Sequence, residues 1–152
     1  MTKVSVVTPA SGEVIQLGPI QMRILEDGST TDHRLGIGEI TLPPRTPGPP
    51  QHRHARHDEG FYVVSGAAQF TVGDTVYDAP SGSLVMIPPG APHTFANPGD
   101  EPTVLLNTFT PDLYVQYFRD LGQMIAGGQP LTPESTVQVM GRYATTAAKD
   151  YA

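Results

Sequence analysis

Short runs of alternating hydrophobic and polar residues recur through the first two-thirds of the chain, and glycine- and proline-rich turns separate them. Alternation with a period of two is the pattern of a strand with one buried face. The runs expected to form strands are 14–17, 20–25, 35–42, 59–64, 67–72, 75–79, 83–87, 92–97 and 103–109. About nine strands that recur roughly every eight to twelve residues predict an all-β antiparallel sandwich or barrel.

The spacing of hydrophobic residues changes to three or four beyond residue 110, which predicts helices. Thr110 is expected to cap the first helix, with Pro111 at its first position, and Gly127-Gly128 is expected to end it. A second, shorter helix is expected to begin at Thr132-Pro133. The side chains expected to pack these helices on the barrel are those of Leu113, Tyr117, Leu121, Met124, Ile125, Val137, Met140 and Tyr143.

The composition agrees with one domain over residues 1–152, with a barrel core at about 14–109 and C-terminal helices at about 111–145. The chain contains 16 glycines and 16 prolines, which favour many turns and short elements. It has no cysteine, so neither disulfides nor thiolate metal sites are expected. A formal net charge of −6, with only two lysines, argues against a nucleic-acid-binding surface.

No segment of the sequence indicates a membrane span or an export signal. No run approaches 18 apolar residues, which is the length that a membrane helix needs. The first 14 residues lack the continuous apolar core of a signal peptide. We therefore expect a cytoplasmic protein that does not bind membranes.

The densest polar feature places His52, His54, His57 and Glu59 within eight positions, and His93 follows. His52 and His54 are two residues apart, so they face the same side of an extended strand. His57 and Glu59 share a face in the same way if their strand begins at His57. Imidazole and carboxylate groups without thiolates favour a divalent metal held by nitrogen and oxygen.

Two connecting segments flank these predicted elements. Five prolines at 43–50 predict a stiff, extended segment that takes no part in a sheet ladder and delivers the chain to the histidines. The polar stretch 26–34 is expected to form a loop in which His33 is solvated.

The side chains around the histidines predict an apolar pocket. The same alternation that turns Glu59 and His93 inward also turns Phe61, Val63 and Phe95 inward, and Met86 and Phe109 are expected to join them. A cavity with this lining suits a flat or extended, weakly charged organic molecule. It contains no cluster of Lys or Arg for a phosphate group.

Two motifs around the polar residues resemble the signatures of the cupin family. The first is His52-x-His54, four residues, Glu59, six residues and Gly66, and the second is Gly82, five residues, Pro88-x-Gly90, two residues, His93, three residues and Asn97. The resemblance covers residues 35–110 and implies a double-stranded β-helix, the jelly-roll barrel of cupins. The leading glycine of the first signature has no counterpart at its usual spacing, although Gly48 lies nearby.

The resemblance also implies one divalent metal ion per subunit, held by His52, His54, Glu59 and His93. His57 competes with Glu59 for the fourth protein position, and whichever is not a ligand is a candidate base beside a metal-bound water. Zinc is the expected metal, with iron, nickel or manganese as alternatives.

Two segments, 42–66 and 109–125, resemble the small polyketide cyclases of actinobacterial aromatic-polyketide pathways. That resemblance implies a non-redox aldol cyclisation and dehydration of a poly-β-ketone, with a substrate delivered by an acyl carrier protein. The run 60–64 and the helix pair also resemble quercetinase-like cupins, which implies a dioxygenase, and a non-catalytic small-molecule-binding cupin is a third alternative. Cupins commonly pair as homodimers, here through the strands at 14–25.

Overall fold

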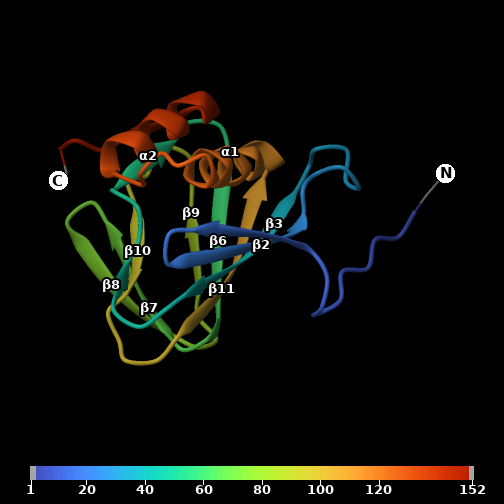
Figure 1. Cartoon of the computed structure of the whole chain (residues 1–152). Helices are drawn as coiled ribbons and strands as arrows, with labels where there is room; N and C mark the ends of the chain where they lie inside the picture. The colour runs from blue at the N-terminus through green and yellow to red at the C-terminus, as the bar shows by residue number, and fades with distance from the viewer. Residues whose placement is uncertain (1–2, 151–152) are drawn as a thin grey trace.

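A computed structural model describes residues 3–150 and contains two larger antiparallel β-sheets and a small third one (Figure 1). In spatial order, the larger sheet contains β1 (Glu13–Leu17), β2 (Ile20–Glu26), β3 (Gly36–Leu42), β11 (Thr103–Thr110), β6 (Asp58–Ser65) and β9 (Leu84–Ile87). The second contains β4 (Thr46–Pro47), β10 (Thr94–Asn97), β7 (Ala67–Val72) and β8 (Thr75–Pro80), and the third pairs β5 (His52–His54) with β12 (Thr145–Ala147). The predicted all-β fold is confirmed. Residues 1, 2, 151 and 152 of the predicted domain lie outside the described residues.

The core lies between the two larger sheets. Every second residue is buried along β3 and along β11, as the alternation in the sequence predicts. Phe61 of β6 and Phe70 of β7 contact each other across the interior at a ring-centroid distance of 5.2 Å, and neither side chain is exposed. A one-residue slip of any of these strands would turn its buried side chains to solvent, so the core fixes the register that positions the polar residues.

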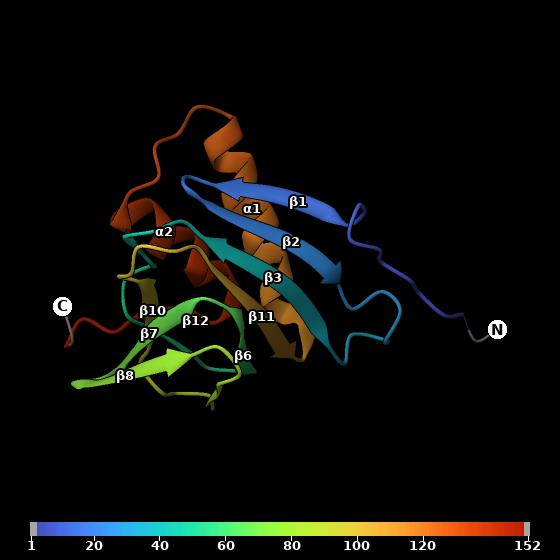
Figure 2. The ribbon, with the colours of Figure 1, turned by 90° about the horizontal axis from the view of Figure 1, so that it is seen from below.

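The C-terminal cap, defined as residues 112–147, lies over one end of the barrel. It contains η1 (Asp112–Tyr114), α1 (Val115–Ala126), α2 (Pro133–Met140), η2 (Gly141–Tyr143) and strand β12. Figure 2 shows α1 crossing behind β1, β2 and β3. Gly122 of α1 allows this approach, because a Cβ atom there would lie 2.5 Å from Cγ2 of Ile15 on β1. No helix of residues 3–150 is long and apolar enough to cross a membrane.

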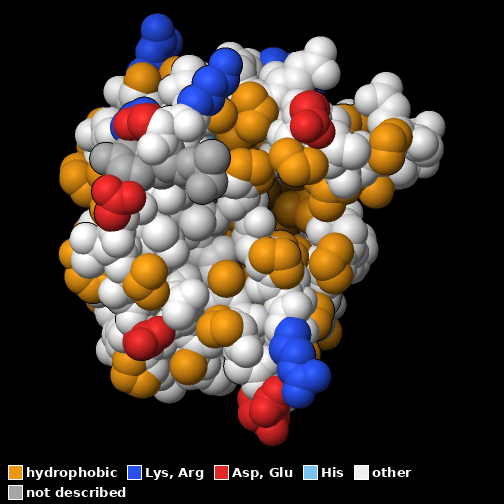
Figure 3. Space-filling view, turned by 90° about the vertical axis from the view of Figure 1, so that its left-hand side faces the viewer, with side chains coloured by type: hydrophobic (Ala, Val, Ile, Leu, Met, Phe, Trp, Pro, Cys, Tyr) orange, Lys and Arg blue, Asp and Glu red, His pale blue; other side chains and the backbone are white. Residues whose placement is uncertain are grey.

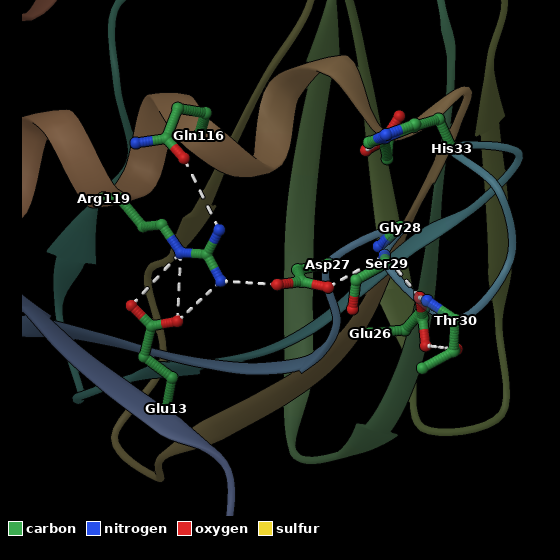
Figure 4. A network of polar contacts seen from close by, with 10 residues as sticks. Glu13, Glu26, Asp27, Gly28, Ser29, Thr30, His33, Gln116 and Arg119 are labelled. Atoms are coloured by element: carbon green, nitrogen blue, oxygen red, sulfur yellow. Dashed lines mark hydrogen bonds and ion pairs between the residues drawn. The ribbon is translucent and has the colours of Figure 1, made fainter. Parts of the chain in front are cut away.

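An ion-pair network on the surface holds α1 to the N-terminal hairpin (Figure 4). Arg119 of α1 donates hydrogen bonds to Glu13 Oε1 on β1 at 2.8 Å and to Asp27 Oδ2 beyond β2 at 2.9 Å. His33 lies in the adjoining loop and is exposed as predicted, but its Nδ1 lies 2.8 Å from Asp112 Oδ2. Charged contacts therefore supplement the apolar packing of the cap on the barrel.

Three local predictions are corrected by the structure. Thr110 is not a helix cap: it ends β11, and the residue that precedes η1 is Pro111, which makes no side-chain capping bond. The proline-rich segment does enter a sheet, because Thr46–Pro47 pairs with β10. The C-terminal region contains β12 in addition to helices, and no hydrophobic alternation in the sequence indicated it. The predicted start of the second helix is confirmed, since α2 begins at Pro133 and the Thr132 hydroxyl accepts a hydrogen bond from the Ser135 amide at 3.0 Å.

Candidate metal centre and cavity

Strand β5 and its neighbours gather three histidines at the end of the barrel that the cap covers. His52 and His54 project from the same face of β5, and both side chains are buried. On one side β5 pairs with β12, where Thr145 lies opposite His54. On the other side His52 and His93 exchange backbone hydrogen bonds of 3.1 and 3.0 Å. Two residues 41 positions apart in the chain are thus joined directly by their backbones.

Glu59, the second residue of β6, completes a compact group. One candidate ligand atom from each of His52, His54, Glu59 and His93 can be chosen so that all four lie within 4.8 Å of one another. Glu59 Oε1 lies 3.0 Å from His54 Nε2 and 2.8 Å from His93 Nε2. All four residues are at most 3% exposed.

The other nitrogen of each histidine ring has a hydrogen-bond acceptor of its own. His52 Nδ1 lies 2.8 Å from the Pro50 carbonyl, and His93 Nδ1 lies 2.9 Å from the Ala91 carbonyl. His54 Nδ1 lies 2.8 Å from the Thr145 hydroxyl, which in turn donates to the Tyr143 carbonyl. With a metal bound, a hydrogen on each Nδ1 would leave each Nε2 free as a ligand, in place of the contacts that Nε2 of His54 and of His93 make with Glu59 Oε1.

The electrostatics of the group also suit a cation. Burial, together with the neighbouring His93 and His54, lowers the pKa of His52 to about 3. Burial alone would raise the pKa of Glu59, but hydrogen bonds from His54 and His93 lower it below its usual value. A neutral imidazole at His52 and an ionised carboxylate at Glu59 are the protonation states that bind a divalent metal, so these residues fit the metal ion that the sequence predicts.

His57 is buried beside this group without belonging to it. Its ring lies 4.1 Å from that of His54, it is 1% exposed, and neither of its nitrogens has a hydrogen-bond partner among the described residues. Burial is the main cause that lowers its pKa to about 4. Glu59 and His57 compete for the fourth position. Glu59 is the one whose side chain lies among the three histidines, and His57 is outside this group.

A cavity of about 340 Å³ opens onto His52 and Glu59 of the candidate metal-binding group, which is His52, His54, Glu59 and His93. His52, Glu59, Asn107 and Phe95 contribute to its wall from the barrel, and the proline-rich segment 47–50 forms part of its side. Gly48 lets this segment pass β10, because a Cβ atom there would lie 2.0 Å from the Phe95 carbonyl oxygen. Figure 3 shows the mouth as a recess surrounded by hydrophobic side chains.

The predicted pocket residues divide into three groups. Phe95 lines the cavity. Phe61, Val63 and Phe109 face inward but are fully buried in the core, outside the cavity wall. The prediction for Met86 is wrong: it pairs with Gly60, one position away from the inward pair Glu59 and Ile87, and its side chain is 54% exposed.

Most of the apolar wall comes from residues that the sequence did not assign to the pocket. The cap contributes Tyr114, Tyr117, Phe118, Leu121, Leu131, Thr132, Pro133 and Thr136, and the first hairpin contributes Leu17, Pro19, Ile20 and Met22. Tyr114 stacks on Tyr117 at 4.3 Å and meets the His54 ring edge-on at 4.4 Å. Burial raises the pKa of the Tyr114 phenol, which therefore keeps its proton at neutral pH. The helical spacing that placed Tyr117 and Leu121 on one face was the only sequence signal for this wall.

Asn107 of β11 is a second site residue that the sequence did not indicate. Its Nδ2 donates to Glu59 Oε2 at 3.1 Å and to the Gly60 carbonyl at 2.9 Å. It therefore holds the carboxylate from the side opposite the histidines.

The comparison with protein families matches residues 38–109 to the Cupin domain, and this segment contains all four residues of the metal-binding group. The chain contains a cupin domain. The predicted resemblance to the cupin superfamily and the predicted jelly-roll fold are both confirmed. A comparison with curated proteins found no match.

Several solved structures share this cupin fold. KdgF from Halomonas sp. superposes with a TM-score of 0.64 at 20% identity, over 72% of this chain and 94% of that one. The polyketide cyclase RemF from Streptomyces resistomycificus superposes with a TM-score of 0.63 at 19% identity, over 71% and 80%. The cupin domain of Cnp3 from Schizosaccharomyces pombe gives 0.60 at 17% identity, over 86% and 85%. At these identities the similarity shows the fold alone.

Proposed function

We propose that this cupin is a metal-dependent polyketide cyclase that catalyses an intramolecular aldol closure and dehydration of a poly-β-ketone. The observation that carries the proposal is the position of the metal-binding group in the wall of an otherwise apolar, aromatic cavity. Such a cavity binds an extended, uncharged chain while its polar end meets the oxygens of that chain. RemF has the same fold, so the fold is compatible with this class of reaction.

The residues of the site would have two roles, which are to polarise a ketone oxygen of the substrate and to orient its chain. His52, His54, Glu59 and His93 would hold the ion, and a bound divalent cation such as zinc would polarise a ketone oxygen as a Lewis acid. The aromatic wall of the cap would fold the chain so that the attacking carbon meets the intended carbonyl, and would exclude water from the closing ring.

The base that removes the methylene proton was predicted to be a metal-bound water, with whichever of Glu59 and His57 is not a ligand as the protein alternative. Glu59 borders the cavity, whereas His57 is enclosed behind the His54 ring and does not line it. His57 is therefore out of direct reach of a substrate proton, and Glu59 could take that proton only if its carboxylate did not hold the metal. An intramolecular aldol reaction involves no net redox change, so the proposal requires no oxygen.

The composition of the wall argues against phosphorylated sugars, which are implied for other cupins such as the sugar phosphate isomerase from Silicibacter pomeroyi (TM-score 0.55, 23% identity). No Lys or Arg of residues 3–150 lines this cavity. A phosphate group buried there would lack the Lys or Arg side chain that usually binds it.

The test compares two reactions in protein purified without added metal and then analysed for its metal content. We expect cyclisation of a synthetic poly-β-ketone under argon, with activity retained after the metal is exchanged for zinc. Consumption of oxygen with a flavonol, together with loss of activity in the zinc form, would instead identify a dioxygenase. Binding of both compounds without turnover in any metal form would support a non-catalytic cupin.

Two partners belong to the proposal, an acyl carrier protein and a second copy of this chain. A poly-β-ketone is reactive, so delivery by an acyl carrier protein is part of the proposal. We also propose a homodimer through the N-terminal hairpin, where β1 is an edge strand of the larger sheet. Sedimentation that shows a monomer at micromolar concentration would remove the dimer from the proposal.

A further inference from the structure

Two buried polar atoms of cavity-lining residues have no hydrogen-bond partner among residues 3–150. They are the hydroxyl of Tyr114, which is 2% exposed, and Oδ1 of Asn107, which is fully buried. Buried polar groups are nearly always paired, and leaving one unpaired costs free energy. Because both residues line the same cavity, two such atoms are a reason to look for a ligand that pairs with them.

The chemistry of the two atoms is opposite. The Tyr114 phenol has a hydrogen to donate. The hydroxyls of Tyr117 and Thr145 are close enough to shift its pKa, but neither meets the distance and angle of a hydrogen bond. The Asn107 amide is oriented by two acceptors, since its Nδ2 donates to Glu59 Oε2 and to the Gly60 carbonyl. Oδ1 is therefore a true acceptor. A flipped amide would place Oδ1 against two other acceptors, Glu59 Oε2 and the Gly60 carbonyl oxygen.

We propose that Tyr114 and Asn107 form a donor–acceptor pair that selects ligands carrying both a carbonyl and a hydroxyl or enol group. Tyr114 donates to the carbonyl oxygen, and Asn107 Oδ1 accepts from the hydroxyl. A β-ketone chain that is partly enolised, or partly cyclised to a phenol, presents both groups in one molecule. The inference rests on the proposed function for the identity of the natural ligand.

A site built to hydrogen-bond a ligand rejects analogues that lack the bonding group, because its own buried groups then stay unpaired. The apolar wall supplies affinity for any flat aromatic molecule. Selectivity among such molecules therefore depends on the few polar atoms of the wall. Tyr114 and Asn107 are therefore expected to set which oxygenation pattern is accepted.

The test measures binding by calorimetry in the zinc-loaded protein and needs no turnover. The probes are 6-hydroxy-2-acetonaphthone, 2-acetonaphthone without the hydroxyl, and 2-naphthol without the carbonyl. Tyr114→Phe is expected to lower the affinity for both ketones about 5- to 30-fold and to change the affinity for 2-naphthol by less than about twofold. Tyr143→Phe, which removes a phenol of the cap that does not line the cavity, is the matched control and leaves all three affinities unchanged.

Asn107 is tested through a ratio of affinities, because its substitution also disturbs Glu59. In the wild type, the hydroxyl of 6-hydroxy-2-acetonaphthone is expected to improve binding about 5- to 30-fold over 2-acetonaphthone. In Asn107→Leu that ratio is expected to fall to about one, whatever the change in metal content. A ratio that is unchanged in Asn107→Leu would overturn the role of Oδ1.

Thermal unfolding separates ligand recognition from a structural role of Tyr114. If its hydroxyl is unpaired in the free protein, Tyr114→Phe leaves the midpoint unchanged or raises it. A lower midpoint, or an equal loss of affinity for all three probes, would overturn the proposal and show that the hydroxyl supports the fold. Either result leaves the cyclisation test of the proposed function standing, since that test measures turnover.

Discussion

The barrel and the C-terminal cap contribute unlike halves of the same site. The barrel supplies the polar half, in which His54, Glu59 and His93 are fixed by hydrogen bonds and almost completely buried. The cap supplies most of the apolar half, an aromatic wall around Tyr114 and Tyr117. We expect the polar half to carry the chemical step, which can be the same for many substrates. We expect the apolar half to determine which substrates bind.

The two halves are nevertheless joined at one strand. β12 belongs to the cap and pairs with β5, so Thr145 reaches from the cap to Nδ1 of His54. The cap is therefore expected to affect the metal as well as the substrate. The following changes test how far the division between the halves holds.

The largest effect is expected from the choice between Glu59 and His57. Glu59→Ala is expected to lower metal affinity by more than about 100-fold, because it removes the only carboxylate of the group. His57→Phe is expected to keep one metal ion per chain, since the His57 ring packs among His54, Tyr114 and Phe109. Plasma mass spectrometry of dialysed protein measures both.

The result that contradicts this assignment is its reverse, with metal lost in His57→Phe and kept in Glu59→Ala. His33→Ala is the control for a histidine outside the group, because its side chain is 76% exposed. It is expected to bind metal as the wild type does.

A second change tests whether the cap is part of the cooperative fold. Met140 ends α2 and is fully buried, so Met140→Ala is expected to lower the free energy of unfolding by about 2–5 kcal/mol. Gln138→Ala, on the exposed side of the same helix, is the control and stays within about 0.5 kcal/mol. Urea denaturation of the metal-loaded protein measures both. If Met140→Ala gave a separate early transition with the main one unshifted, the cap would be an independent unit.

The third change targets the bond between the halves. Thr145→Val keeps the shape of the side chain but removes the acceptor for His54 Nδ1. Loss of such a supporting bond typically costs about 10- to 100-fold in metal affinity, which is the fall we expect from zinc titration against a competing chelator.

The matched control for this change is the adjacent residue of the same strand. Thr146→Val alters an exposed side chain of β12 and is expected to leave zinc affinity unchanged. Equal affinities in the two variants would mean that the cap positions only the substrate.

The barrel half was predictable because its signals are local. Strand alternation and the spacing of His52, His54, Glu59 and His93 fix which side chains share the interior, whatever lies elsewhere in the chain. The same rule misplaced Met86, because the parity of β9 is set by its pairing with β6 and not by its own sequence.

The cap half was not predictable for the opposite reason. Thr145 meets His54 across 91 positions of the chain, and a three-residue strand carries no periodicity of its own. The spacing of Tyr117 and Leu121 predicts a helix that packs on the barrel, but not that part of its face borders a cavity. Tyr114 and Asn107 acquire a role only from what surrounds them in three dimensions.

The smallest effect is expected where the cap meets the N-terminal hairpin. Hydrogen bonds from Ser29 and Arg119 lower the pKa of Asp27 well below its usual value. A depressed carboxyl pKa stabilises the fold above the unfolded-state pKa of about 3.9, and this contribution is lost as the pH falls through the folded-state pKa. Asp27 is 31% exposed, so solvent screening limits the contribution to about 1 kcal/mol or less at pH 7.

Asp27→Asn is therefore expected to unfold at slightly lower urea concentration than the wild type at pH 7, and the difference should shrink as the pH falls below about 4. Asp100→Asn is the control, because its partner Arg45 and Asp100 itself are both about three-quarters exposed and should give no measurable change. A difference that stays constant down to about pH 3 would show that Asp27 acts through packing or hydrogen bonding rather than charge. The hairpin would then be held to α1 mainly by the close contact of Gly122 with Ile15, and the ion pairs would add little to the stability of this contact.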